Sequence, residues 1–406
     1  MASILYLTNA FGTPDEPNAG AAARHYFHVK ALADTGNTVT VITANASTVG
    51  TTSSHSTKNY GNVKVIYANV GSPPTKNILS RLVYFLRYAV SGIFIAVREG
   101  ARFDCIVASS PSIFIPVQGW ILAVLKRAKL VVDVRDLWCD AVETVPFLIR
   151  TRWQRPIRMF LIWLNRNLEI FAYRRADLLF GSSKSQVEFI KSCVSSFVPV
   201  HQAPNGFDAK LAEEAAQSAE PDYLHNLRRA YAKIALFAGK FTSYTDLENV
   251  VEAAEHLESS IAIVLLGGGY TKAIIQQKAV LNNIHNVYFH EPVSKREALR
   301  YMKHADLLLI NYSPELAWSK TVPGKFYDYL YFNRPVVAAA LPGELTDLME
   351  EAGTDFVVPP REPIALAKAI ERASKTDVET REFLIQRFDR AKHADKFAEA
   401  VNALFK

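Results

Sequence analysis

The feature that most constrains the fold is an alternation of short apolar runs with longer helical patterns, which occurs twice along the chain. Each apolar run has the length and hydrophobicity of a strand buried on both faces. Strands that alternate with helices predict a parallel sheet covered by helices on both sides. The pattern runs from residue 4 to 201 and restarts at 234, so it predicts two α/β domains. The expected strands are 4–8, 38–43, 63–70, 103–108, 129–134, 178–181 and 197–201, then 234–238, 261–266, 287–290, 306–311 and 336–340.

The length of 406 residues allows two domains that each have a core. We expect an N-terminal domain at 1–204, a C-terminal domain at 205–380, and a final helical segment at 381–406 that packs back on the first domain. The three cysteines are widely spaced and odd in number, which argues against a disulfide framework and fits a reducing compartment. Neither a signal peptide nor a membrane-spanning apolar run is evident, so we expect a cytoplasmic protein.

The stretch from residue 319 to 340 carries the clearest chemical pattern. Pro323 and Gly324 precede a helical pattern, and Lys325 falls in its first turn. The lysine ammonium would add to the free N–H groups and the positive end of the helix dipole, which predicts an anion site that suits phosphate. Asp328 lies on the same face and could accept hydrogen bonds from sugar hydroxyls. The pattern indicates a nucleotide or nucleotide-sugar site, although an ordinary turn with a solvated lysine explains it as well.

Other loops that follow strands could contact the same kind of ligand. Gly20 lies at the start of the first helix and would let a phosphate approach the backbone, with Arg24 one turn further on. Lys240 ends the first strand of the second half and could converge with Lys325 on one diphosphate. The glycines at 267–269 leave room for a ligand, or else they form a tight turn.

Asp136 is the candidate catalytic residue of the first half. It follows the strand 129–134, together with Arg135. Ligands of open α/β sheets bind beyond the carboxyl ends of the strands. A carboxylate there could act as a general base or stabilise positive charge on a sugar ring. The alternative is that Arg135 and Asp136 pair with other residues to hold the loop.

The segment from 150 to 175 interleaves arginines with aromatic residues and has a single acidic residue, Glu169. This composition is typical of a helix that lies on an anionic membrane surface. The apolar and basic helix expected at 78–97 favours the same reading. An RNA site would have the same interleaving but lacks a supporting signature, and a core helix with an arginine-rich outer face stays open. The residues expected to contact the membrane are Arg152, Trp153, Arg155, Arg158 and Trp163.

Several motifs follow the order found in retaining glycosyltransferases of the GT-B fold, the family-four group, which the chain resembles over nearly its whole length. They include Phe237-Ala-Gly-Lys, Val264-Leu-Leu-Gly-Gly-Gly, Lys325-Phe-Tyr-Asp-Tyr-Leu, Arg334-Pro-Val-Val and Pro204-Asn-Gly-Phe-Asp. The element Arg135-Asp-Leu-Trp resembles bacterial N-acetylfucosaminyl and other amino-sugar transferases of O-antigen or capsule synthesis. The resemblance implies an α/β fold of the GT-B type, with two Rossmann-like domains facing a cleft.

The resemblance also implies roles for individual residues. Asp136 would be the catalytic carboxylate, and Asp328 would bind the ribose hydroxyls. Two positions depart from the family pattern: Lys320 stands where a first glutamate is common, and Thr245 stands where a lysine is usual. The residues expected at the donor diphosphate are Gly20, Lys240, Gly324 and Lys325, and those expected around the nucleobase are Gly267, Gly268, His290 and Pro292.

These implications give one expected function. The enzyme would move an N-acetylated deoxyhexosamine from a UDP-linked donor, with retention of configuration, to a polyprenyl-diphosphate-linked acceptor. It would act peripherally on the inner face of the cell membrane, without a cofactor, a metal or a nucleic acid. No DxD motif ends a strand, and lysines with helix dipoles can neutralise the departing diphosphate. The alternatives are a nucleotide-sugar epimerase of the same fold and a non-catalytic nucleotide-sugar-binding subunit.

Overall fold

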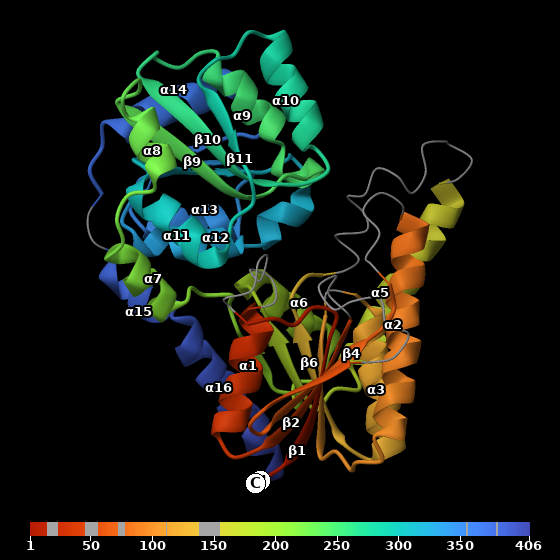
Figure 1. The fold of residues 1–406 in the computed structure, drawn as a ribbon. Helices are drawn as coiled ribbons and strands as arrows, with labels where there is room; N and C mark the ends of the chain where they lie inside the picture. Colours follow the sequence, from red (N-terminus) through yellow and green to blue (C-terminus); the bar gives the residue numbers. More distant parts are fainter. Residues whose placement is uncertain are drawn as a thin grey trace. The chain divides into compact units, whose positions relative to one another are not determined.

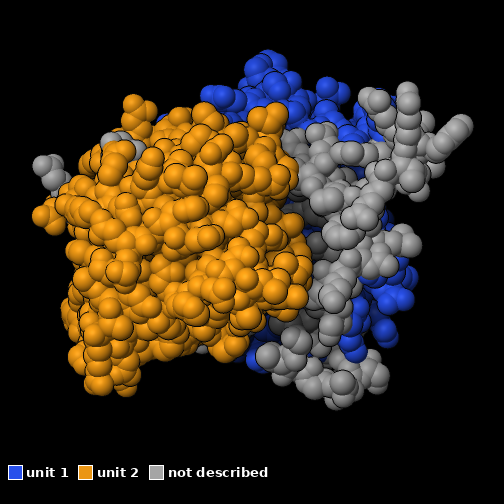
Figure 2. All heavy atoms as spheres, turned by 90° about the horizontal axis from the view of Figure 1, so that it is seen from above, with its two compact units in different colours: residues 1–13, 21–204, 391–406 blue, residues 14–20, 205–390 orange. Residues whose placement is uncertain are grey.

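The computed structural model describes residues 1–13, 23–44, 56–71, 78–110, 112–137, 155–354, 356–378 and 381–406. They form two compact units (Figure 2). Of the described residues, those within 1–13, 23–204 and 391–406 belong to unit 1, and those within 205–390 belong to unit 2. Each unit is built around a parallel sheet with helices on both faces, so the predicted α/β fold with two Rossmann-like domains is confirmed.

The sheet of unit 1 has the order β3-β4-β2-β1-β5-β6-β7-β8, and its neighbouring strands are parallel except for β3 and β4. We did not predict β3, because its residues are polar and mostly exposed; it forms through backbone pairing with β4 across a turn at Gly61. The strands are β1 (Ser3–Thr8), β2 (Thr38–Ala44), β3 (Ser56–Tyr60), β4 (Val63–Ala68), β5 (Cys105–Ser109), β6 (Lys129–Val134), β7 (Leu178–Gly181) and β8 (Val200–Gln202).

Alternate residues of these strands face two different helix layers (Figure 1). Leu5, Leu7 and Val132 face one layer, and Ile4, Tyr6 and Val131 face the other. The first layer consists of α2 (Ile78–Arg98), α3 (Phe114–Lys126), α5 (Arg155–Tyr173) and α6 (Lys184–Cys193). The second layer consists of α1 (Ala23–Asp34) and α16 (Arg390–Asn402), which leads into η6 (Ala403–Phe405).

The sheet of unit 2 is entirely parallel, with the order β11-β10-β9-β12-β13-β14. Its strands are apolar on both faces and buried by helices on both sides. The strands are β9 (Lys233–Lys240), β10 (Ile261–Gly268), β11 (Val287–His290), β12 (Leu307–Asn311), β13 (Val336–Ala339) and β14 (Val357–Val358). One face is covered by α7 (Ala209–Ala216), α8 (Asp222–Leu227), α11 (Lys295–His304), α12 (Gly324–Tyr331), α13 (Glu344–Glu351) and α15 (Glu382–Arg387), and the other by α9 (Leu247–Ala254), α10 (Lys272–Leu281) and α14 (Pro363–Ser374).

The C-terminal segment divides between the units. Leu384 of α15 belongs to the core of unit 2, and Phe397 and Val401 of α16 belong to the core of unit 1. The segment that returns to unit 1 is therefore 391–406, which is shorter than the expected 381–406. Arg390 marks the change, because its guanidinium donates to the carbonyl oxygens of Asn205 and Gly206 at 2.8 and 2.7 Å.

The strand order fixes where a ligand can bind. In each sheet the chain starts in the middle and later crosses to the other side, and such a switch point leaves the carboxyl ends of two adjacent strands open. In unit 1 these strands are β1 and β5, with β6 next to them; in unit 2 they are β9 and β12. Two short 3-10 helices, η4 (Ser243–Thr245) and η5 (Leu316–Lys320), lie in the loops after β9 and β12.

Candidate functional site

Lys325 is the best-defined cation of unit 2. It lies in the first turn of α12, as predicted, and its Nζ is 3.4 Å from the centroid of the Phe237 ring. Burial, together with the charge of Lys295, lowers the pKa of Lys325 to about 7. The ammonium is therefore only part-protonated at neutral pH, and an arriving anion would stabilise its charged form.

Two glycines allow this arrangement. Gly239 has φ +154°, and a Cβ there would lie 2.8 Å from the Nζ of Lys325. Gly267 is its partner on β10 and has φ +142°; a Cβ there would lie 1.9 Å from the carbonyl oxygen of Gly239. Gly239 thus admits the lysine, whereas Gly267 is required by the close approach of two strands. Gly268 is paired with the exposed Lys240, and its added Cβ would lie 3.1 Å from Pro292.

Asp328 is buried one turn after Lys325, on the inner face of α12. Its Oδ2 forms an ion pair with the Nζ of Lys295. Sequence analysis gave no individual role to Lys295, nor to Phe237. Its Oδ1 is buried and has no hydrogen-bond partner within the described part of the chain. A buried carboxylate oxygen without a donor is costly, so Asp328 is suited to accept a hydrogen bond from a ligand hydroxyl.

His290 ends β11 with a fixed ring orientation. Its Nδ1 lies 2.9 Å from the carbonyl oxygen of Glu291, which can only accept, so Nδ1 carries the proton. Its Nε2 then accepts from the hydroxyl of Tyr301 at 3.0 Å. Both ring nitrogens are therefore used inside the protein, and a ligand would contact the backbone after β11 rather than the imidazole.

The segment after β12 brings aromatic and polar groups together. Trp318 stacks on Tyr312 with 5.9 Å between ring centroids and packs against Tyr244 at 4.6 Å. The Nε1 of Trp318, the Oγ of Ser313 and the Oε2 of Glu315 are buried without a hydrogen-bond partner among the residues that the structure describes. Aromatic faces beside such groups suit the apolar and hydroxyl faces of a sugar. Lys320, which stands where the family pattern commonly has a glutamate, is exposed at the end of η5.

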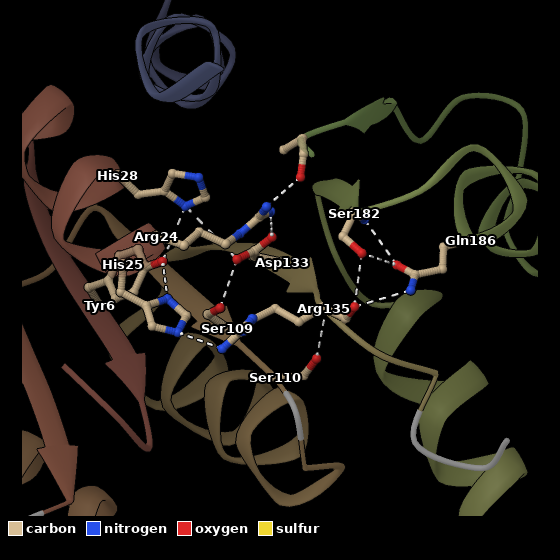
Figure 3. Close-up of polar contacts among 11 residues, drawn as sticks. Tyr6, Arg24, His25, His28, Ser109, Ser110, Asp133, Arg135, Ser182 and Gln186 are labelled. Atoms are coloured by element: carbon tan, nitrogen blue, oxygen red, sulfur yellow. Dashed lines mark hydrogen bonds and ion pairs between the residues drawn. The ribbon is translucent and has the colours of Figure 1, made fainter. Parts of the chain in front are cut away.

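In unit 1 a buried ion pair lies beside the carboxyl ends of β5 and β6 (Figure 3). Arg24 donates to Asp133 at 2.7 Å and to the carbonyl oxygen of Ala203, and Ser109 donates to Asp133 at 2.7 Å. Although burial alone would raise the pKa of Asp133, Arg24 and His28 hold it well below its usual range. The structure thus gives Arg24 protein partners for both terminal nitrogens, and its predicted contact with a ligand anion stays a prediction.

A hydrogen-bonded row of neutral side chains adjoins this pair (Figure 3). Burial and the nearby arginines lower the pKa of His25 well below its usual value and that of His28 to about 3, so both rings are neutral at pH 7. Arg135 can only donate, so the Nε2 of His25, at 3.3 Å, accepts from it. The Nδ1 of His25 then donates to the Tyr6 hydroxyl at 3.1 Å, which donates to the Nδ1 of His28 at 3.3 Å.

The backbone of Arg135 is held from both sides of β6 (Figure 3). Its N–H donates to the Oγ of Ser110 at 3.1 Å, and its carbonyl oxygen accepts from the Nε2 of Gln186 at 3.1 Å. The Oγ of Ser182 lies 2.9 Å from the same carbonyl. The exposed Asp136 follows directly, so the predicted catalytic carboxylate extends from a firmly held peptide. Sequence reasoning missed these serines and Gln186, because nothing in their spacing marks them.

Three helices of unit 1 that lie side by side (Figure 1) carry many exposed apolar residues, which we call the apolar face. It lies on α2, α3 and α5; the first two have no acidic residue. Glu169 of α5 is buried and paired with Arg166 at 3.1 Å, so the helix shows no carboxylate to solvent. The exposed apolar residues are Val83, Leu86, Val90, Phe94, Val97, Val124, Leu125, Met159, Phe160, Trp163 and Leu164.

Some predicted residues cannot be placed. Gly20, Arg152 and Trp153 lie outside the described residues, as do the side chains of Arg155 and Arg158. Of the predicted membrane residues, Trp163 is described and its side chain is exposed. Within the described ranges, no group of three or more His, Cys, Asp or Glu side chains is placed to hold a metal ion. A search of the described helices found none long and apolar enough to cross a membrane.

Two family models match the chain, one on each half. The model described as "Glycosyl transferase 4-like domain" matches residues 20–206, and the model described as "Glycosyl transferases group 1" matches residues 226–400. A search of curated proteins gave no match. The two models leave only short parts of the chain uncovered; the first begins after β1, and the second begins before β9.

Solved structures with the same fold cover nearly the whole chain. A sucrose-phosphate synthase from Thermosynechococcus elongatus is 17% identical over 100% of this chain and 99% of its own, with a TM-score of 0.75. An α,α-trehalose-phosphate synthase (UDP-forming) from Burkholderia vietnamiensis is 13% identical over 100% and 99%, with a TM-score of 0.74. Anabaena HepE in complex with UDP-glucose is 17% identical over 99% and 100%, with a TM-score of 0.66.

Proposed function

Because the chain is a glycosyltransferase with the GT-B fold, we propose that it moves an N-acetylated deoxyhexosamine from a UDP-linked donor to a polyprenyl-diphosphate-linked acceptor. The transfer retains the anomeric configuration and serves the synthesis of a surface polysaccharide such as O-antigen or capsule. The observation that carries the donor part is the half-buried Lys325 one turn before Asp328, whose buried Oδ1 has no hydrogen-bond partner among the residues that the structure describes. Together they match a diphosphate and a ribose hydroxyl.

The choice of UDP draws on similar proteins. HepE has been solved in complex with UDP-glucose, and the trehalose-phosphate synthase is UDP-forming. In this chain Lys240, Lys325 and the N-terminus of α12 neutralise the departing diphosphate without a metal ion. The backbone around Gly268 and Pro292 contacts the nucleobase, and the segment with Trp318 contacts the transferred sugar.

Asp136 supplies the catalytic carboxylate. It stands at the carboxyl end of β6, and the hydrogen bonds to the backbone of Arg135 fix the peptide from which it extends. In this proposal Asp136 accepts a proton from the acceptor hydroxyl or stabilises positive charge on the sugar ring. Geometry held in advance reduces the reorganisation that the reaction requires.

The apolar face supports a lipid-linked acceptor. A monomeric protein rarely exposes so many contiguous apolar side chains unless they contact a partner or a membrane. The absence of exposed carboxylates on α2, α3 and α5 favours an anionic surface over a protein of mixed charge. The enzyme therefore works as a peripheral protein on the inner face of the cell membrane.

One incubation separates this function from its two alternatives. The protein is mixed with UDP-N-acetylhexosamines, with or without a polyprenyl-diphosphate-linked sugar in vesicles, and all products are identified by mass spectrometry. Sugar transfer that depends on the lipid supports the proposal. Epimerisation of the donor without lipid would establish the epimerase instead, and binding without turnover would establish a non-catalytic subunit.

A further inference from the structure

Arg135 is a cation that the fold holds in place with no side-chain hydrogen bond to a carboxylate of the described residues, although the charge of the adjacent, exposed Asp136 favours its charged form. The one buried acid of its cluster, Asp133, is engaged by Arg24 at 2.7 Å and by Ser109. Arg135 instead makes its side-chain contact with His25, which is neutral. Within the buried cluster the charges of Arg24 and Asp133 cancel, and the charge of Arg135 is faced by the exposed Asp136.

The guanidinium of Arg135 also has hydrogen-bonding capacity to spare. Its Nε is buried and has no hydrogen-bond partner among the residues described, and its side chain is only half-buried. An arginine that is fixed at its N–H, at its carbonyl and at one terminal nitrogen loses little entropy when it binds a ligand. Planar guanidinium groups with free donors bind phosphates in two-point contacts.

The place of Arg135 in the sheet suits a ligand. Register pairs Ser109 of β5 with Asp133 of β6, so Arg135 lies just beyond the carboxyl ends of both strands and next to Asp136. An anionic group held by Arg135 would therefore lie close to the proposed catalytic carboxylate.

We propose that Arg135 binds the diphosphate of the lipid-linked acceptor and that His25 is the positioning residue that orients its guanidinium. This inference rests on the proposed function, because it assigns a residue to that function's acceptor. The same diphosphate chemistry occurs in the donor. The acceptor is favoured because the donor's diphosphate already has Lys240 and Lys325 in unit 2, whereas Arg135 belongs to the unit that carries the apolar face.

Calorimetry on the full chain tests this without turnover. The protein is saturated with UDP and then titrated with geranyl diphosphate, with geraniol as the uncharged control. We expect wild type to bind geranyl diphosphate more tightly than geraniol. Arg135→Gln should weaken binding of geranyl diphosphate about tenfold to a hundredfold, and Arg135→Lys should weaken it less, because charge is kept and the two-point contact is lost.

Two controls sharpen the result. Arg175→Gln removes a charge from an exposed arginine that precedes β7, at the amino ends of the strands rather than their carboxyl ends. It should leave the affinity for geranyl diphosphate unchanged. His25→Phe should weaken geranyl diphosphate binding, and His25→Gln should restore part of it, because an amide oxygen can accept from Arg135. If Arg135→Gln does not fold, Arg135→Lys and the two His25 variants carry the test.

Three outcomes would overturn the inference. The first is equal affinity of wild type for geraniol and geranyl diphosphate. The second is wild-type affinity of the Arg135 variants for geranyl diphosphate. The third is a loss of UDP affinity in these variants by the same factor as their loss of geranyl diphosphate affinity. The last result would assign Arg135 to the donor. Failure of sugar transfer by wild type would contradict the proposed function alone, because these binding measurements do not depend on transfer.

Discussion

As the proposed ligand of the donor diphosphate, Lys325 should make donor binding sensitive to pH. Burial lowers its pKa to about 7 in the free protein, and a bound diphosphate favours the charged form and raises that pKa again. Below pH 7 the lysine is already charged, so the affinity should be constant. Above pH 7 binding must take up a proton, so the affinity should fall by up to about tenfold per pH unit until the pKa of the complex is reached.

Titration calorimetry with UDP-N-acetylglucosamine at pH 6 to 9 checks this, because its diphosphate does not titrate near neutral pH. Lys325→Met should bind more weakly at pH 6 and lose the pH dependence. A wild-type affinity that stays level from pH 7 to 9 would show that Lys325 does not contact the diphosphate.

A substitution at Gly239 gives a second test of the role of the Lys325 Nζ in donor binding. In Gly239→Ala the new Cβ would lie 2.8 Å from the Nζ of Lys325 and push the ammonium away from the Phe237 ring. We expect UDP binding to weaken about tenfold, the loss typical of one charge-assisted contact. Gly353→Ala is the matched control, since Gly353 also has positive φ but no atom within 4 Å of an added Cβ. Equal loss in both variants would attribute the effect to backbone strain.

Asp136→Asn tests the catalytic assignment. The amide keeps the size of the side chain but removes its charge and basicity, so turnover should fall by about a hundredfold or more. UDP binding should be unchanged, because the donor cations belong to unit 2. Steady-state rates and calorimetry on the same preparation measure both. If Asp136→Asn turns over at the wild-type rate, Asp136 is not the catalytic carboxylate.

Single residues show where sequence reasoning reaches its limit. Lys325 and Asp328 could be predicted because a helix start and a helical spacing fix their positions locally. The partners that tune them, Phe237 and Lys295, come from β9 and α11, and only the packed fold brings those elements together. For the same reason the sequence did not indicate that Arg24 pairs with Asp133, more than a hundred residues away.

At the level of elements, the strand alternation predicted both sheets because apolar runs buried on two faces have a strong signature. The polar strand β3 lacks this signature and was not predicted, since backbone pairing rather than burial holds it. The apolar face was visible in part: the composition of α5 suggested a membrane surface. The apolar, basic pattern at 78–97 favoured the same surface, but which residues of α2 form its exposed stripe, repeated every three or four residues from Val83 to Val97, required knowledge of which side faces the sheet.

The apolar face predicts membrane binding that one substitution weakens. Phe94 is 66% exposed in the middle of the stripe on α2. Phe94→Glu removes an apolar anchor and adds a repelled charge, so binding to anionic vesicles should fall about tenfold. Sedimentation with phosphatidylglycerol vesicles measures this. Val280→Glu, at an exposed apolar position of α10 in unit 2, should sediment like wild type.

The basic residues before and within α5 give a second arm of the same experiment. Replacing Arg152, Arg155 and Arg158 with glutamate should weaken vesicle binding most at low salt, where charge attraction is least screened. If Phe94→Glu and the triple variant both sediment like wild type, this face does not contact the membrane. A change from monomer to dimer in wild type that Phe94→Glu abolishes would show instead that the face is a protein interface.

For the whole molecule, the account assigns the donor to unit 2 and the acceptor, with its membrane, to unit 1. In the described part of the chain, the backbone passes between the units at residues 204–205 and 390–391, so both sets of groups belong to one folded protein. The sequence could predict this division because the strand pattern restarts at residue 234. The sugar and the acceptor are less constrained, since side chains that select ligands commonly lie in loops, whose shape depends on the complete fold.

The most direct test of the central claim is the ratio of labelled sugar recovered in lipid to UDP released. Wild type is incubated with a UDP-N-acetylhexosamine labelled in its sugar and with vesicles that contain a polyprenyl-diphosphate-linked sugar. The account predicts one labelled sugar in the lipid fraction for each UDP released, and loss of both products in Asp136→Asn. UDP released at the same rate without the lipid acceptor, with no label in the lipid fraction, would contradict it.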